Sequence, residues 1–234
     1  LDQRKYAGVD DVSIEKLKRF IQVFFNYCNY QVINLGLKRK NGEIFPYWDE
    51  YIKFAQFCGY KFLSWNVWDR GQPTSIGHQT AMFGIDHEWL FVFGKERKEL
   101  IPTVPTKQAS LDRQKYRHRR TRRDENGDIR IVAKWEKTKA YKHLGTVTHI
   151  NCANTIGNSE HPAIYPVDLP AKYIEAMTSK DQIIVDPFLG SGTTMMACEN
   201  LDRTCFGMEL SPDYVALALD KMHKNFGITP KLIS

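Results

Sequence analysis

The stretch Ile183–Thr194, IIVDPFLGSGTT, leads from a short apolar run through two glycines into a segment that favours a helix. Gly190 and Gly192 can adopt positive φ and let the backbone approach a ligand with no Cβ in the way. The amides at the start of the following helix would face that ligand. Asp186 ends the apolar run, at the position where open α/β sheets bind ligands. The stretch therefore predicts a strand, a glycine-rich turn and a helix that together form a binding site.

A second expected strand, Thr204–Leu210, carries an acidic residue near its end. Glu209 lies 19 residues after Gly190, a spacing at which a carboxylate can accept hydrogen bonds from ribose hydroxyls. The glycines do not have the GxGxxG spacing of dinucleotide sites, and the phosphate-binding loop GxxxxGK[ST] does not occur in the sequence. An adenosyl ligand without a phosphate fits these residues better than either alternative.

The order of strand and helix over residues 182–225 predicts a βαβ unit, and a parallel sheet follows from it. Periodicity and capping residues place the other elements on both sides of this unit. Helices are expected at Ser13–Tyr27, Tyr47–Cys58, Leu169–Thr178, within Gly190–Leu201 and at Ser211–Asn225, and strands at Gln31–Leu37, Lys61–Trp68, Trp89–Phe93 and Gln182–Val185. In the first helix one apolar face is expected to hold Leu17, Phe20, Ile21, Phe24 and Phe25.

Positive charge is concentrated in residues 97–150, which contain 15 Lys and Arg against 6 Asp and Glu, while the whole chain has a net charge of +6. The run Arg113–Arg123, RQKYRHRRTRR, is its densest part. Such a local positive field attracts polyanions, of which nucleic acid is the commonest. A solvated, charged loop is the alternative for a run of this kind.

Other site types have little support in the sequence. The five cysteines form no CxxC pair, which indicates thiols in a reducing compartment rather than a disulfide framework or a zinc site. His87-Glu88 precedes an expected strand, where a structural role is favoured over a metal or acid–base role. No signal peptide is visible, and no apolar run approaches the length of a membrane span. We therefore expect no metal, no membrane association and a cytoplasmic location.

Three motifs in order give a resemblance to a known family. HPAIYPVDLP (His161–Pro170), DPFLGSGTT (Asp186–Thr194) and GMELSPDYV (Gly207–Val215) resemble motifs of the site-specific DNA amino-methyltransferases, which make N6-methyladenine or N4-methylcytosine. The order is similar to the permuted subgroup, in which the catalytic half precedes the cofactor half. The segment Asp86–Lys95 extends the resemblance more weakly.

The resemblance implies S-adenosyl-L-methionine as the cofactor and assigns its site residue by residue. The implied cofactor-binding residues are Asp186, Pro187, Phe188, Gly190, Gly192, Thr193, Thr194, Glu209, His161, Pro162 and Ala163. In the family the inserted region recognises the DNA target, so the basic segment is expected to contact phosphates and bases. The implied DNA-binding residues are Arg117, Arg119, Arg120, Arg122, Arg123 and Lys134.

One family motif is missing from the sequence. The family's catalytic motif ends in Pro-Pro followed by an aromatic residue, and none of the ten prolines here is followed by another. In the permuted order this motif precedes the first helix, so we expect it upstream of Leu1 and assign no catalytic residue within the chain. Loss of the motif is the competing explanation. It is disfavoured because a missing central strand would leave buried backbone groups unpaired.

The expected fold is α/β, the Rossmann-like fold of S-adenosylmethionine-dependent methyltransferases, with a mostly parallel sheet flanked by helices. Residues 1–96 would form the catalytic half, incomplete at its N-terminus, 97–150 the basic recognition insert, and 151–234 the cofactor-binding half. The expected function is methyl transfer to an exocyclic amino group of double-stranded DNA, as in a bacterial or phage restriction–modification enzyme. A homodimer is compatible with it. A non-catalytic DNA-binding relative, and a methyltransferase acting on RNA or protein, are the alternatives. The choice between adenine and cytosine, the recognition sequence and the oligomeric state stay open.

Overall fold

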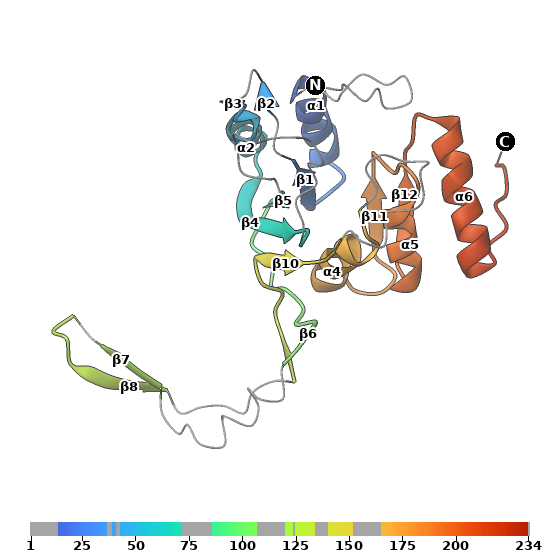
Figure 1. Ribbon diagram of the computed structural model, residues 1–234. Coiled ribbons are helices and arrows are strands. Elements are labelled where there is room, and N and C mark those ends of the chain that lie inside the picture. Colours follow the sequence, from blue (N-terminus) through green and yellow to red (C-terminus); the bar gives the residue numbers. More distant parts are fainter. Residues whose placement is uncertain are drawn as a thin grey trace.

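The computed structural model describes residues 14–36, 39–40, 43–71, 86–106, 120–123, 125–133, 140–151 and 165–233. Runs of strands follow α1 (Ile14–Phe25) and α2 (Tyr47–Phe57), and helices and strands alternate only from α4 (Asp168–Met177) onward. The strands form two main sheets with helices packed on them (Figure 1). Within the described residues, no helix has the length and apolar character needed to cross a membrane.

The larger sheet has four strands in the order β1-β5-β4-β10. They are β1 (Tyr30–Leu35), β5 (His87–Gly94), β4 (Lys61–Asp69) and β10 (Val147–His149). β5 runs antiparallel to both β1 and β4, whereas β10 is parallel to β4. The sheet is therefore mixed, and the expectation of a mostly parallel sheet is wrong for this half. A parallel β4–β5 pair would need a crossover, usually a helix, and the Gly-, Pro- and Thr-rich sequence between them does not favour one.

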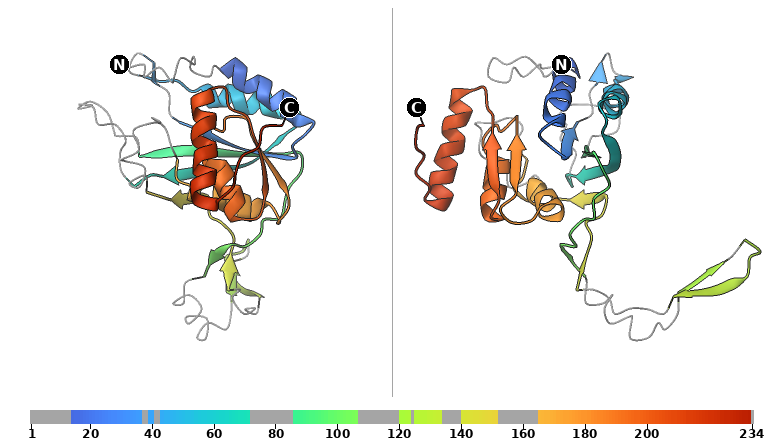
Figure 2. Two further views of the ribbon diagram at one scale, coloured as in Figure 1. Left: turned by 90° about the vertical axis from the view of Figure 1, so that its right-hand side faces the viewer. Right: turned by 180° about the vertical axis from the view of Figure 1, so that it is seen from behind.

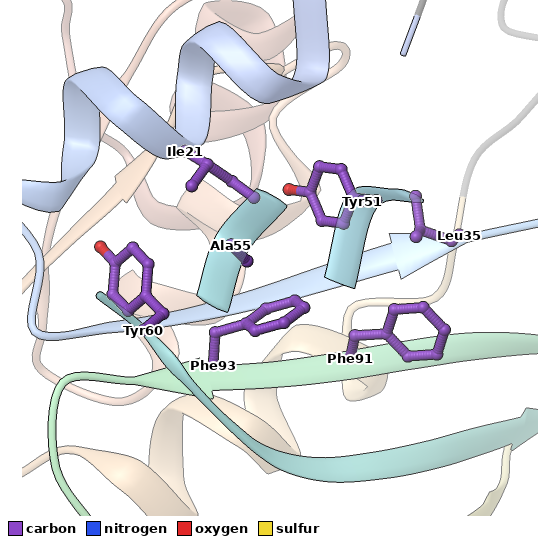
Figure 3. Packing of buried hydrophobic residues seen from close by; sticks show 7 residues of the cluster. All are labelled: Ile21, Leu35, Tyr51, Ala55, Tyr60, Phe91 and Phe93. Atoms are coloured by element: carbon purple, nitrogen blue, oxygen red, sulfur yellow. The ribbon is translucent and has the colours of Figure 1, made fainter. Parts of the chain in front are cut away.

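β5 is buried on both sides, because helices cover both faces of this sheet. Phe91 and Phe93 face α1 (Ile14–Phe25) and α2 (Tyr47–Phe57), and pack there with Ile21 and Tyr51 (Figure 3). Alternate residues of a strand face opposite sides. Leu90 and Val92 therefore point the other way and pack with residues of α4 (Asp168–Met177).

The apolar face of α1 differs from the expected one. Ile21 is buried, with Leu17 and Phe25 packed around it. Phe20 instead contacts Phe188, with ring centroids 4.6 Å apart. The apolar residues of this helix thus span two faces, and one of them meets the second half of the chain.

The second half is a compact βαβ unit, as expected. β11 (Ile183–Asp186) leads into α5 (Thr193–Asn200), β12 (Thr204–Gly207) and α6 (Pro212–Phe226). β11 and β12 are parallel, with Asp186 opposite Gly207. Figure 2 shows α5 and α6 beside this pair of strands, with α4 next to α5. In the described part of the chain β11 pairs with β12 alone and β1 with β5 alone, so one edge of each is unpaired.

The basic segment contains short strands that only partly match the expected insert. β6 (Val104–Pro105) pairs with β9 (Tyr141–Lys142), and β7 (Arg120–Arg123) with β8 (Ile129–Ala133) in a hairpin that stands apart from both sheets (Figure 1). A further hairpin joins β2 (Arg39–Lys40) to β3 (Glu43–Ile44). β10 lies within the range 97–150 but belongs to the main sheet. The part that stands outside the fold is thus narrower than that range.

Candidate cofactor site

The turn after β11 is held by backbone hydrogen bonds to the neighbouring strand. The amide of Met208 donates to the carbonyl of Asp186 at 2.8 Å, and the amide of Leu189 donates back to the carbonyl of Met208 at 2.9 Å. The Asp186 carboxylate accepts a hydrogen bond from the amide of Phe188 at 2.9 Å. These bonds fix the Asp-Pro-Phe segment at the carboxyl end of the sheet, where the sequence predicted a ligand site.

The two glycines of the turn adopt the conformations for which glycine is suited. Gly190 has φ 54° and Gly192 has φ 84°, both left-handed. Gly192 is the N-cap of α5. A Cβ on Gly192 would lie 2.8 Å from the Cβ of Ala218, so α6 packs directly against the turn. The sequence therefore requires glycine at this position both for its conformation and for the approach of a helix.

Glu209 follows β12 and contacts the glycine-rich turn. Its Oε2 accepts a hydrogen bond from the amide of Gly190, and its Oε1 accepts one from the amide of Ser211, each at 2.8 Å. An ionised carboxylate has about four lone-pair sites. The two amides use two of them, so each oxygen can still accept from one of two adjacent ribose hydroxyls.

Burial separates the residues around the turn into two groups. Ser191, Thr193 and Thr194 are at most 7% exposed and support the start of α5. Phe188 is 45% exposed, and Met208 and Leu210 beside Glu209 are 51% and 79% exposed. Large exposed apolar side chains next to a carboxylate suit a ligand with a flat apolar ring and a polyol, such as an adenosyl group.

Tyr165 is a residue of this site that the sequence analysis missed. Its hydroxyl lies 2.8 Å from Oγ1 of Thr194. Burial, and next the nearby charge of Asp186, raise the pKa of Tyr165 above its ordinary value. Tyr165 lies inside the quoted motif HPAIYPVDLP, but no property of the sequence alone marks its hydroxyl as a partner of Thr194.

The remaining expected residues are only partly described. His161, Pro162 and Ala163 lie outside the described residues, as do Arg117, Arg119 and Lys134. Arg120, Arg122 and Arg123 belong to β7, and Arg123 is exposed, with Nη1 donating to the carbonyl of Gly127 at 3.3 Å. The structure thus brings together Asp186–Thr194 and Glu209, which are expected to bind the cofactor, and places three of the expected DNA-binding arginines on one hairpin.

Glu88 has the structural role expected of it. Its carboxylate forms an ion pair with Arg70, with 2.6 Å between Oε1 and Nη1, and accepts a hydrogen bond from Asn34 at 2.8 Å. These contacts tie the carboxyl ends of β1 and β4 to the start of β5. Within the described ranges, no group of three or more His, Cys, Asp or Glu side chains is arranged to hold a metal ion.

A family model described as DNA methylase, N6_N4_Mtase, matches residues 9–220. The chain belongs to this DNA methylase family. The match includes the Asp186–Thr194 turn and Glu209, as well as the four-stranded sheet that precedes them. The family membership therefore confirms the resemblance that the three motifs indicated.

Curated relatives include several type II methyltransferases. M.HpaI from Haemophilus parainfluenzae is 24% identical over 95% of this chain and 65% of its own length. M.SmaI from Serratia marcescens is 36% identical over 67% of this chain and 44% of its own length. The chain thus spans less than two thirds of the length of these relatives.

Solved structures of DNA methyltransferases share the fold. The M1.HpyAVI–SAM complex matches with a TM-score of 0.62 at 18% identity, covering 91% of this chain and 85% of that one. The cytosine-N4-specific PvuII DNA methyltransferase matches with a TM-score of 0.58 at 16% identity, covering 93% and 73%. The expected α/β, Rossmann-like methyltransferase fold is therefore confirmed.

Proposed function

We propose that the protein transfers a methyl group from S-adenosylmethionine to an exocyclic amino group, N6 of adenine or N4 of cytosine, in double-stranded DNA. The observation that carries the proposal is the contact between Glu209 and Gly190. It joins the carboxylate expected at the ribose to the turn expected at the methionine end, in a chain of the DNA methylase family.

The residues present fit this cofactor. Glu209 has free lone pairs for the ribose hydroxyls, and Phe188 and Leu210 offer apolar surface for the adenine ring. The start of α5 carries a partial positive charge suited to the methionine carboxylate. Asp186 provides the opposite charge for the ammonium group. When bound, the cofactor would supply an electrophilic methyl group on its sulfonium.

The target amino group needs help from the protein, because its lone pair is delocalised into the base. A hydrogen-bond acceptor for its N–H groups, and alignment of the base with the methyl group, would favour the transfer. The target must also leave the duplex stack to reach the site. The family's Pro-Pro motif, which would provide the acceptor, does not occur in the sequence.

We propose that a further strand lies between β1 and β11 in the active protein and carries this acceptor. Support comes from the unpaired edges of β1 and β11 in the described part of the chain. A strand between them would give the outward N–H and C=O groups of both strands hydrogen-bond partners. Amide hydrogen exchange, measured on the protein isolated from its own organism, tests the presence of this strand. The amides of β11 that point away from β12 should be protected, and rapid exchange there would contradict the proposal.

The half with the four-stranded sheet precedes the half with the glycine-rich turn, which supports the permuted arrangement. We retain the division into residues 1–96, 97–150 and 151–234, but limit the recognition insert to the part of 97–150 that lies outside the main sheet. The basic hairpin β7–β8 would contact the DNA. The relatives come from bacteria, where the chromosome lies in the cytoplasm, so we place the reaction there. The homodimer stays a prediction that sedimentation velocity would test.

The test is methyl transfer from labelled S-adenosylmethionine to plasmid DNA, RNA and protein in parallel, followed by nucleoside analysis of the DNA. The proposal expects label in DNA, as N6-methyladenine or N4-methylcytosine. Label only in RNA or protein would favour another methyltransferase. DNA binding without label anywhere would favour a non-catalytic relative.

A further inference from the structure

Tyr165 lies between the two halves of the fold, shortly before α4. Its ring packs against the buried cluster that contains Trp68 and Leu90 of the four-stranded sheet. Its hydroxyl lies 2.8 Å from Oγ1 of Thr194, in the first turn of α5. One side chain thus joins the core of the larger sheet to the start of the helix that follows the glycine-rich turn.

The hydroxyl of Tyr165 shares a hydrogen bond with the hydroxyl of Thr194, and either oxygen can be the donor. Burial and the charge of Asp186 raise the pKa of Tyr165, which favours the neutral phenol further. A threonine hydroxyl has one proton and two acceptor sites. Because Thr194 is only 7% exposed, its bond to Tyr165 determines how its hydroxyl is oriented in the first turn of α5.

The position of this bond points to one end of the cofactor. In the proposed function the start of α5, which contains Thr194, and the carboxylate of Asp186 bind the methionine carboxylate and ammonium. Glu209 lies at the other end, where the ribose would bind. A change at Tyr165 should therefore affect the methionine end and leave the adenosine end in place.

We propose that Tyr165 is a positioning residue that, through Thr194, fixes the start of α5 for binding the methionine part of S-adenosylmethionine. This inference rests on the proposed function. Tyr165, which precedes α4, would thus have a role in the site formed by β11, α5 and β12. It also makes the geometry of the cofactor site depend on the packing of the four-stranded sheet.

The test compares two ligands by calorimetry on the wild-type protein and on Tyr165→Phe. S-adenosylhomocysteine contains the amino-acid end, and 5′-methylthioadenosine lacks it. Loss of one buried hydrogen bond should weaken S-adenosylhomocysteine binding about 3- to 10-fold. Binding of 5′-methylthioadenosine should change by less than about twofold, since it does not use the amino-acid end. Thr194→Val should have the same effect, and Thr194→Ser, which retains the hydroxyl, should restore most of the affinity.

Tyr173→Phe is the matched control. Tyr173 is 5% exposed, lies in the same buried cluster and has its hydroxyl near Asn66 and Thr148. It should alter neither ligand affinity. Equal weakening of both ligands in Tyr165→Phe, or no weakening of either, would overturn the inference while leaving the proposed function intact. Wild-type protein that binds neither ligand would overturn the proposed function itself.

Discussion

Replacement of Gly192 by alanine perturbs the turn at the centre of the site in two separable ways. Its φ of 84° is unfavourable for any residue with a Cβ. The new methyl group would also lie 2.8 Å from the Cβ and 3.2 Å from the Cα of Ala218 in α6. Carbon atoms in contact normally lie about 3.5–4.0 Å apart, so α6 or the turn would have to move.

The size of the effect follows from these two contributions. The left-handed conformation costs about 1–2 kcal/mol for a residue with a Cβ, and forcing a methyl group into a packed site costs about 1–3 kcal/mol. Alanine restricts the unfolded chain and offsets about 0.4–1 kcal/mol of this. We expect the free energy of unfolding to fall by about 3 kcal/mol, together with weaker cofactor binding.

Urea unfolding of the two variants Gly192→Ala and Gly227→Ala separates the contributions. Gly227 is the C-cap of α6 with φ 69°, and no atom lies within 4 Å of a Cβ built there. Its replacement reports the conformational cost alone, about 1 kcal/mol after the same offset. In the double variant Gly192→Ala/Ala218→Gly the closest contact is removed, so it should be less destabilised than the sum of the two single variants.

We expect Gly192→Ala to be more destabilised than Gly227→Ala by at least about 1 kcal/mol, the lower bound for forced packing. Equal destabilisation of the two variants would show that α6 does not press against the turn. A double variant whose destabilisation equals the sum of the single effects would lead to the same conclusion.

Three further perturbations test other parts of the site. Glu209→Gln places an amide donor against a backbone amide and should weaken S-adenosylmethionine binding about 10-fold or more by calorimetry; binding equal to that of the exposed-site control Glu199→Gln would contradict this. Replacing Arg119, Arg120, Arg122 and Arg123 by alanine should weaken DNA binding. The slope of the logarithm of the binding constant against log salt concentration should become shallower by about 0.9 for each phosphate that is no longer neutralised. An unchanged slope, measured by fluorescence anisotropy, would reject the hairpin as a DNA-binding element. The hydrogen bond from His149, and then that from the Gly71 amide, lower the pKa of Asp69. These hydrogen bonds therefore stabilise the folded protein above the ordinary carboxyl pKa, and the stabilisation is lost as pH falls through the lowered pKa. The His149→Ala variant should raise the pKa of Asp69 in a carboxyl NMR titration, and an unchanged pKa would refute the pairing.

Local signals in the sequence were sufficient for the second half of the fold. Each signal acts locally in the sequence: glycines where the turn needs positive φ, Pro212 at the start of α6, and an acidic residue just after the second strand. The structure accordingly places these helices and strands within a few residues of their predicted bounds. The βαβ unit brings two consecutive strand ends together, which placed Glu209 near the glycine-rich turn, but its hydrogen bond with Gly190 was not predicted.

Features that depend on packing across the fold were not predictable. Phe20 was expected beside Leu17, but it faces Phe188, a partner distant in sequence. β10 has only three residues. Its Val147 and Thr148 favour a strand, but so short a run does not show which sheet it joins. The bond between Tyr165 and Thr194 spans 29 residues and depends on how α4 packs between the two halves.

The most direct test of the central claim is the modification state of DNA from a host that lacks its own DNA methylation and expresses the protein as its organism makes it. Mass spectrometry of the nucleosides and sequencing that detects modified bases would be applied to the same DNA. We predict N6-methyladenine or N4-methylcytosine at one short recurring sequence, and less of it with the Glu209→Gln variant at equal expression. Unmodified DNA from a host with abundant folded protein, or methylation on carbon 5 of cytosine, would contradict the proposed function.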